Sequence, residues 1–311
     1  MSTLIAADFS PAEWAEWLPA LRAALPDETL LDRREGVEAE AIDIAIVANP
    51  PAGALAGLPR LRLVQSLWAG VEKLLADPTL PVDVPLARMV DPAMNEAMAE
   101  TALWAVLALQ RDFFDYAAQQ RAAQWAPQPQ RRAAEFGVTV LGLGQMGRTV
   151  ALRLLRNGYR VSGWSARPAA IPGVRTLAGD AALAHAVSDA QVLVNLLPLT
   201  PATRGIIDAR LLATLPRGAS VVNLARGAHV VEADLLAALA SGHIRHAVLD
   251  VFATEPLPPS NPFWSHPQVT VLPHVAAQTD ARSASAVVAA NVAALRAGRP
   301  LQHLVDRARA Y

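Results

Sequence analysis

Three charged side chains in the second half of the sequence are of types that together bind an anion and move a proton. Arg226, Glu255 and His274 each follow closely on an apolar run, and a charge in such a position either lines a cleft or needs a partner. An imidazole exchanges a proton near neutral pH, a neighbouring carboxylate orients it, and a guanidinium grips a carboxylate or carbonyl. Each residue alone has an ordinary structural explanation, but the three together favour a catalytic set.

A glycine pattern in the middle of the chain predicts a dinucleotide phosphate loop. Residues 142–147 read Gly-Leu-Gly-Gln-Met-Gly, between an apolar run at 138–141 and a helical pattern at 145–157. The first glycine permits a tight turn, the second a close approach to a pyrophosphate, and the third packing of helix on strand. The helix N-terminus adds unpaired N–H groups and a positive dipole end. The predicted contacts are Gly142, Gly144, Gln145, Met146 and Gly147.

The end of the next predicted strand indicates which nucleotide binds. An NAD site usually has an acid there to bond the ribose 2′-hydroxyl, but no acid occurs between Trp164 and Asp180. Ser165 and Arg167 stand there instead, and a hydroxyl with a guanidinium suits a 2′-phosphate. We therefore predict NADP(H), with NAD(H) used at lower efficiency. Both residues also fit an ordinary exposed loop.

The elements that position these residues have an α/β pattern. In the first part of the chain, strands are predicted at 3–6, 45–48 and 61–65, with helices at 11–25 and beginning near Val71. In the second part, six strands are predicted at 137–141, 159–164, 191–197, 220–225, 246–252 and 269–275. Helices are predicted between these strands at 145–157, 179–188, 208–215 and 231–241.

These patterns predict two doubly wound parallel-sheet domains, a Rossmann cofactor domain inserted in a flavodoxin-like substrate domain. A last helix at 279–297 has no strand after it, so we expect it to return to the first domain. The substrate domain would then comprise residues 1–100 and 276–311, and the cofactor domain residues 101–275.

A long helical stretch from Pro92 to about Trp125, broken at most once, lies between the two parts. Its Trp104, Phe113 and Phe114 exceed what one small domain needs to bury. We therefore expect a two-fold homodimer through this helix.

Composition narrows the class of protein. The chain of 311 residues has 53% hydrophobic residues, a net charge of −1 and no cysteine. This excludes disulfides and thiol chemistry and argues against a nucleic-acid partner. No secretion signal or membrane span is apparent, and no metal site is predicted, so we expect a cytoplasmic protein.

Several segments resemble the D-isomer-specific 2-hydroxyacid dehydrogenases, over essentially the whole chain. They are Asn223–Gly227, Leu249–Phe252 with Glu255–Pro258, Pro273–Ala277, Asn195–Pro198 with Thr200–Pro201, and Val305–Arg309. Within that family the sequence is most similar to the glyoxylate/hydroxypyruvate reductase A group. Residues 47–51 carry smaller side chains than in that group, which leaves the choice of 2-ketoacid open.

The resemblance implies a role for each motif residue. His274 would be the general acid/base, Glu255 its carboxylate partner and Arg226 the substrate anchor, while Asp250 would help to hold the nicotinamide end. The implied cofactor contacts further include Trp164, Leu197, Pro198, Thr203, Leu224, Ala225 and Ala276. The implied substrate loop of the first domain is Trp68, Ala69 and Gly70, whose backbone N–H groups would hold a carboxylate.

The resulting hypothesis is reduction of a small 2-ketoacid by NADPH, glyoxylate to glycolate or hydroxypyruvate to D-glycerate. β-Hydroxyacid dehydrogenases share the glycine pattern, but they carry it near the N-terminus and use a lysine on a later helix, whereas the only lysine here is Lys73. A nucleotide-sensing binding protein on the same scaffold is the alternative from another class.

Overall fold

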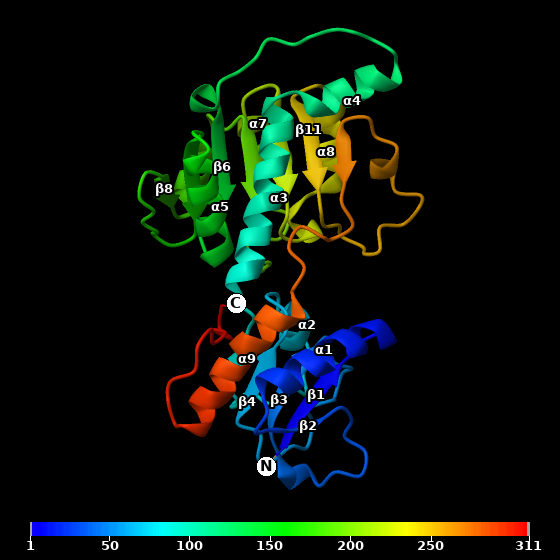
Figure 1. The fold of residues 1–311 in the computed structure, drawn as a ribbon. Helices are drawn as coiled ribbons and strands as arrows, with labels where there is room; N and C mark the ends of the chain where they lie inside the picture. The colour runs from blue at the N-terminus through cyan, green and yellow to red at the C-terminus, as the bar shows by residue number, and fades with distance from the viewer. Residues whose placement is uncertain (1, 310–311) are drawn as a thin grey trace. The chain divides into compact units, whose positions relative to one another are not determined.

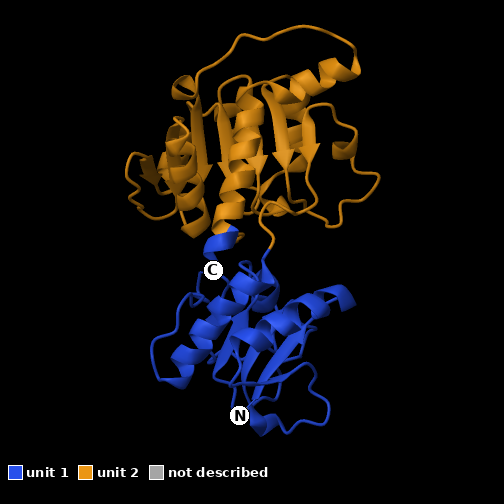
Figure 2. Cartoon of the chain, viewed as in Figure 1, with its two compact units in different colours: residues 1–94, 279–311 blue, residues 95–278 orange. Residues whose placement is uncertain are grey.

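The computed structural model describes residues 2–309 and divides into two compact units. One unit consists of residues 1–94 and 279–311, and the other of residues 95–278 (Figure 2). The sequence predicted the cuts at 100/101 and 275/276. The first observed cut falls near the start of helix α3 (Pro92–Gln110), because the first turn of this helix belongs to the first unit.

The first unit contains a five-stranded parallel sheet in the order β2-β1-β3-β4-β5, the flavodoxin-like order. Its strands are β1 (Ser2–Ala7), β2 (Thr29–Leu31), β3 (Ile42–Ala48), β4 (Leu63–Ser66) and β5 (Leu86–Ala87). Its helices are α1 (Pro11–Ala24), α2 (Glu72–Leu75) and α9 (Ala281–Arg296). All seven residues of β3 are buried, as expected of a central strand covered on both faces.

The last helix, α9, belongs to the first unit and packs against α1. Asn291 Nδ2 on α9 donates to Gln65 Oε1 on β4 at 2.7 Å. Arg296, at the end of the helix, forms ion pairs with Glu28 at 2.7 Å and with the fully buried Asp43. A buried carboxylate is tolerated only with such a partner, so this ion pair ties the end of α9 to the start of the central strand β3.

The second unit contains a seven-stranded parallel sheet in the order β12-β11-β10-β9-β6-β7-β8 (Figure 1). Its strands are β6 (Gly137–Leu141), β7 (Arg160–Ser165), β8 (Arg175–Ala178), β9 (Val192–Asn195), β10 (Ala219–Asn223), β11 (Ile244–Leu249) and β12 (Val269–Val271). Its helices are α3, α4 (Phe113–Arg121), α5 (Gln145–Arg156), α6 (Asp180–Val187), α7 (Ala209–Thr214) and α8 (Glu232–Ala240). This is the Rossmann order with one further strand, and the two sheets together confirm the predicted fold class.

Alternate residues of the central strands enter two separate cores. On β6, Val138 and Val140 pack in one cluster with α3 and α5, whereas Leu141 packs in the other with α6, α7 and α8. Short edge strands were missed: β2, β5 and β8 were not predicted from the sequence. β8 is at most half-buried and therefore lacks the apolar run that marks the central strands.

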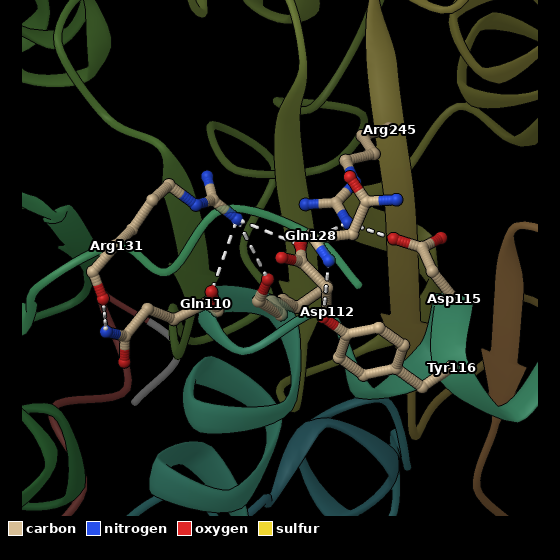
Figure 3. A network of polar contacts seen from close by, with 8 residues as sticks. Gln110, Asp112, Asp115, Tyr116, Gln128, Arg131 and Arg245 are labelled. Carbon is tan, nitrogen blue, oxygen red and sulfur yellow. Dashed lines mark hydrogen bonds and ion pairs between the residues drawn. The ribbon is translucent and has the colours of Figure 1, made fainter. Parts of the chain in front are cut away.

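The helix predicted from Pro92 to Trp125 is two helices, and a polar network holds the break between them (Figure 3). Asp112 has a left-handed backbone, with φ 57°, and its buried carboxylate pairs with Arg131 at 3.2 Å and with Arg245. Arg245 also pairs with Asp115 on α4. The helical part ends at Arg121, and the segment from 122 to 130 is exposed. Within residues 2–309, no helix is both long and apolar enough to cross a bilayer.

His246 on β11 is the clearest pH-sensitive residue of this region. Its side chain is buried, stacks on Phe114 with 4.4 Å between ring centroids, and has its Nε2 2.9 Å from Thr270 Oγ1. Burial lowers the pKa of His246 to about 4. The unfolded chain therefore binds a proton more readily than the folded protein as the pH falls from about 6.5 to 4.

We expect the free energy of unfolding to fall across this pH interval, by up to about 3 kcal/mol from this one group. His246→Gln, which cannot be protonated, should flatten the dependence of stability on pH. Urea unfolding of both proteins at pH 7, 6 and 5 measures the difference. Parallel pH profiles for the two proteins would show that His246 does not cause the loss.

Candidate active site

The glycine turn after β6 is held by close backbone packing. Gly142 has φ +92°, and a Cβ added there would lie 2.6 Å from Leu196 O. A Cβ on Gly147 would lie 1.7 Å from Gly142 O. Both positions therefore exclude any side chain, the first for conformation and contact, the second for contact alone.

Gly144 differs from the other two glycines. It precedes α5 with an extended backbone, φ −68°, and no atom of residues 2–309 lies within 4 Å of a Cβ built on it. The first N–H groups of α5, from Gln145 to Gly147, have no acceptor within the helix, and Met146 is half-buried. The space beside Gly144 and these amides fit a pyrophosphate.

The end of β7 carries the residues predicted to select the nucleotide. Ser165 closes the strand, and its Oγ donates to Arg167 O at 2.6 Å, which folds the loop back on itself. The indole of Trp164 is buried and donates to Gly179 O at 2.9 Å. Trp164 borders the glycine turn through its backbone, because its carbonyl accepts from Gly142 N.

His274 and Glu255 form the pair that the sequence predicted. His274 Nδ1 lies 2.7 Å from Glu255 Oε2, and their side chains are 53% and 35% exposed. The other carboxylate oxygen of Glu255 accepts from Phe252 N at 2.9 Å. Glu255 is thus fixed from two sides, and the Nε2 edge of His274 does not take part in the pair.

Asp250, at the end of β11, shapes the loop that carries His274. Its backbone carbonyl accepts from His274 N at 2.9 Å, and its carboxylate accepts from Val275 N at 2.7 Å and Ala276 N at 3.1 Å. His274 has φ 56°, a left-handed conformation that costs energy for a non-glycine residue. The residue predicted to hold the nicotinamide end therefore also holds three consecutive amides, two through its carboxylate and one through its backbone carbonyl.

Arg226 follows β10, the strand next to β11. Its Nη1 donates to Ala225 O at 2.7 Å. The next residue, Gly227, lies so close to the chain after β11 that an added Cβ would be 1.8 Å from Phe252 C. The loop of Arg226 therefore packs on the segment that leads to Glu255, and the three predicted catalytic residues follow three adjacent strands.

The remaining predicted cofactor residues also lie at the carboxyl ends of the strands. Leu197, Leu224, Ala225 and Ala276 are buried. Thr203 Oγ1 donates to Pro198 O at 2.7 Å, which closes the loop after β9. Behind these strand ends lie three buried polar residues that sequence reasoning missed, Asn195, Asn223 and His229. An asparagine at the end of each of two apolar strands was the available signal.

In the first unit, the predicted substrate loop follows β4. Trp68 N donates to Ser66 Oγ at 3.0 Å, so this N–H is already occupied, which corrects the prediction that it holds a carboxylate. The Trp68 ring packs edge-on against Trp17 with 5.8 Å between centroids, which explains a tryptophan on this turn. Among the described residues, the amides of Ala69 and Gly70 have no hydrogen-bond acceptor.

A Rossmann domain with a phosphate turn, an imidazole–carboxylate pair and a nearby arginine defines a nicotinamide-dependent dehydrogenase. Residues 103–276 match the NAD-binding domain of the D-isomer specific 2-hydroxyacid dehydrogenases. The chain belongs to this family, as the sequence predicted.

Solved structures agree with this assignment. A D-isomer specific 2-hydroxyacid dehydrogenase from Xanthobacter autotrophicus Py2, in complex with NADPH and MES, is 41% identical with a TM-score of 0.95, over 100% of this chain and 99% of that one. The NADPH-dependent glyoxylate/hydroxypyruvate reductase from Sinorhizobium meliloti, with NADP and sulfate, is 36% identical with a TM-score of 0.93, over 100% of both chains. A probable 2-hydroxyacid dehydrogenase from Rhizobium etli CFN 42, with NADP, HEPES and tartaric acid, is 30% identical with a TM-score of 0.93, over 100% of this chain and 99% of that one.

The glycine turn gives a matched pair of variants. Gly144→Ala should keep the thermal stability, because its Cβ meets no protein atom, yet weaken dinucleotide binding about tenfold or more, or ~1.4 kcal/mol. Gly147→Ala should destabilise the fold itself through its clash with Gly142 O. Thermal melts and NADPH fluorescence titrations measure both effects. Unchanged NADPH binding by Gly144→Ala would contradict this placement of the pyrophosphate.

Proposed function

We propose that the protein is an NADPH-dependent reductase of small 2-ketoacids, converting glyoxylate to glycolate and hydroxypyruvate to D-glycerate. The observation that carries the proposal is the His274–Glu255 pair at 2.7 Å, which follows strands of the same sheet as the glycine turn. Two relatives with the same overall fold support the substrate class and the cofactor: the Sinorhizobium reductase and the NADPH-bound Xanthobacter dehydrogenase.

The chain's own residues would supply binding and proton transfer. The amides at the start of α5 would hold the pyrophosphate, with Ser165 and Arg167 toward the 2′-phosphate. Leu197, Pro198, Leu224, Ala225 and Asp250 would line the cofactor, which when bound supplies the hydride. Residues 95–278 would form the cofactor domain, and Ala69 and Gly70 of the first unit would bind the substrate carboxylate.

His274 would donate its Nε2 proton to the carbonyl oxygen as that oxygen gains charge. Glu255 holds the opposite ring nitrogen at 2.7 Å, and this contact fixes the orientation of the ring so that Nε2 is left for the substrate. Arg226 would grip the 2-ketoacid and, with His274, stabilise the developing alkoxide. Asp250 would maintain the loop conformation in which Nε2 faces the substrate.

NADPH oxidation tests the proposal with a panel of glyoxylate, hydroxypyruvate and larger 2-ketoacids. We expect kcat/KM to be higher with NADPH than with NADH, and kcat to fall at least about 100-fold in His274→Asn, because a positioned acid contributes about 10²–10⁴ in rate. NADPH affinity should be unchanged in this variant. His185→Asn, on α6 and near Arg175, is the matched control and should keep wild-type turnover.

Each outcome of this assay is decisive. Binding of NADPH without turnover of any 2-ketoacid would favour a nucleotide-sensing protein over an enzyme. NADH used as well as NADPH would contradict the role of Ser165 and Arg167. Turnover by His274→Asn close to that of the wild type would remove this histidine from proton transfer.

We further propose a cytoplasmic homodimer formed through α3 and α4. Trp104 and Phe113 on these helices are 43% and 53% exposed, and Trp104 lines an open hollow with Thr101, Leu272 and Val275. Exposed aromatic side chains of this kind mark protein interfaces. Sedimentation velocity should show a dimer that Trp104→Glu weakens, and a monomeric wild-type protein would contradict the proposal.

A further inference from the structure

A hydrogen-bonded network of buried polar side chains connects the loops after β9 and β10. Asn195 ends β9, Asn223 ends β10, and His229 follows Arg226 in a short 3₁₀ turn, Gly227–His229. All three side chains are fully buried. The proposed proton transfer uses none of them, yet buried polar groups are costly unless they are hydrogen-bonded.

Asn195 is the hydrogen-bond donor to both of the other side chains in this network. Asn195 Nδ2 donates to Asn223 Oδ1 at 2.9 Å and lies 3.0 Å from His229 Nδ1. His229 Nε2 lies 3.2 Å from Pro198 O. A carbonyl oxygen only accepts, so Nε2 carries the ring proton, and Nδ1 is left to accept from Asn195. An imidazolium would place an N–H against the Asn195 amide, so the arrangement requires the neutral ring.

At its two ends, this network holds backbone atoms of two loops. Asn195 Oδ1 accepts from Leu197 N at 3.2 Å, which, with the His229 contact to Pro198 O, fixes the loop after β9. Asn223 Oδ1 accepts from Ala225 N at 3.3 Å, and its Nδ2 donates to Arg226 O at 3.0 Å. One loop carries proposed cofactor contacts, and the other carries the proposed substrate anchor.

Because Asn195 bonds to both other side chains, we expect the loss of a hydrogen bond at one end of this network to disturb the other end. Turning the Asn195 amide would place its oxygen toward Asn223 Oδ1 and His229 Nδ1, and its NH₂ toward Leu197 N. All three hydrogen bonds of this amide would then become repulsive contacts. Asn195, the middle residue, therefore cannot change its orientation alone. No other assignment of donors and acceptors satisfies the three side chains of this network.

We propose that His229, with Asn195 and Asn223, is a positioning unit that makes the placement of Pro198 and of Arg226 interdependent. This inference rests on the proposed roles of Arg226 and of the Leu197–Pro198 loop. His229 contacts the Asn195 side chain and the Pro198 carbonyl, so we assign it a positioning role and not a catalytic one. Loss of His229 affects cofactor binding through Pro198 and substrate turnover through Asn195, Asn223 and the backbone of Arg226.

The test compares three histidine variants in the full-length protein. His229→Leu removes both polar atoms, whereas His229→Gln retains a donor and an acceptor. His243→Leu is the control, because His243 Nε2 also contacts a backbone carbonyl, Leu212 O at 3.0 Å. His243 directly precedes β11 and thus lies at the amino ends of the strands, opposite the proposed site. NADPH affinity is measured by fluorescence titration, turnover by NADPH oxidation with glyoxylate and hydroxypyruvate, and stability by thermal melting.

We expect His229→Leu to weaken NADPH binding and to lower kcat/KM for the 2-ketoacid, each about tenfold, the effect of one lost buried hydrogen bond. His229→Gln should recover most of both losses. His243→Leu should lower the melting temperature without changing either constant. Combining His229→Leu with Asn223→Ala should cost less than the product of the single effects, because both break the same unit.

Three results would overturn the inference. One is kinetics of His229→Leu equal to those of His243→Leu. Another is a loss of NADPH affinity with an unchanged kcat/KM for the 2-ketoacid at saturating NADPH, which would show independent loops. The third is strict multiplication of the two single effects. Absence of turnover by the wild-type protein would remove the proposed function together with the inference, whereas an active wild type with any of these three results removes the inference alone.

Discussion

The arrangement of the site depends on the hydrogen bonds that the buried Asp250 accepts. Its two carboxylate oxygens and its backbone carbonyl accept from three consecutive amides, those of His274, Val275 and Ala276. A left-handed histidine is unfavourable by itself, and these hydrogen bonds offset that cost. The ring of His274 then meets Glu255, which Phe252 N holds from the other side. A single strand end, that of β11, thus supports both members of the pair.

Close backbone contacts set the rest of the site. Gly142 packs on Leu196 and Gly227 packs on Phe252, at distances that leave no room for a Cβ. Each contact joins the ends of two strands of one parallel sheet, where ligand sites of open α/β folds form. Gly144, in contrast, has no protein neighbour for a side chain. The motif at 142–147 therefore contains two kinds of glycine. Gly142 and Gly147 permit close contact between backbone segments, and Gly144 leaves space for a ligand.

The central strands and the missed strands differ in length and, apart from the buried β5, in burial. Central strands such as β3, β6 and β10 are buried at every position, so their apolar runs mark them in the sequence. β2, β5 and β8 have two to four residues, and only their pairing with a neighbouring strand makes them strands. The helix break at Asp112 depends on Arg131 and Arg245. The second of these partners lies 133 residues further along the chain, so the sequence, which allowed for one break in this stretch, could not place it at Asp112.

The family and the parallel α/β class could be predicted from the sequence alone, and the sequence also predicted Arg226, Glu255 and His274 as the catalytic set, because strand ends, glycine spacing and polar residue types are local features of the sequence. How those residues are held became clear only from the folded structure. It showed that Asp250 binds the His274 loop, that Trp68 N is occupied by Ser66, and that Asn195, Asn223 and His229 join two loops. The physical reason is that a hydrogen-bond partner is fixed by where the sheet brings strand ends together, and residues 28 to 34 positions apart share one buried network only after the sheet has formed.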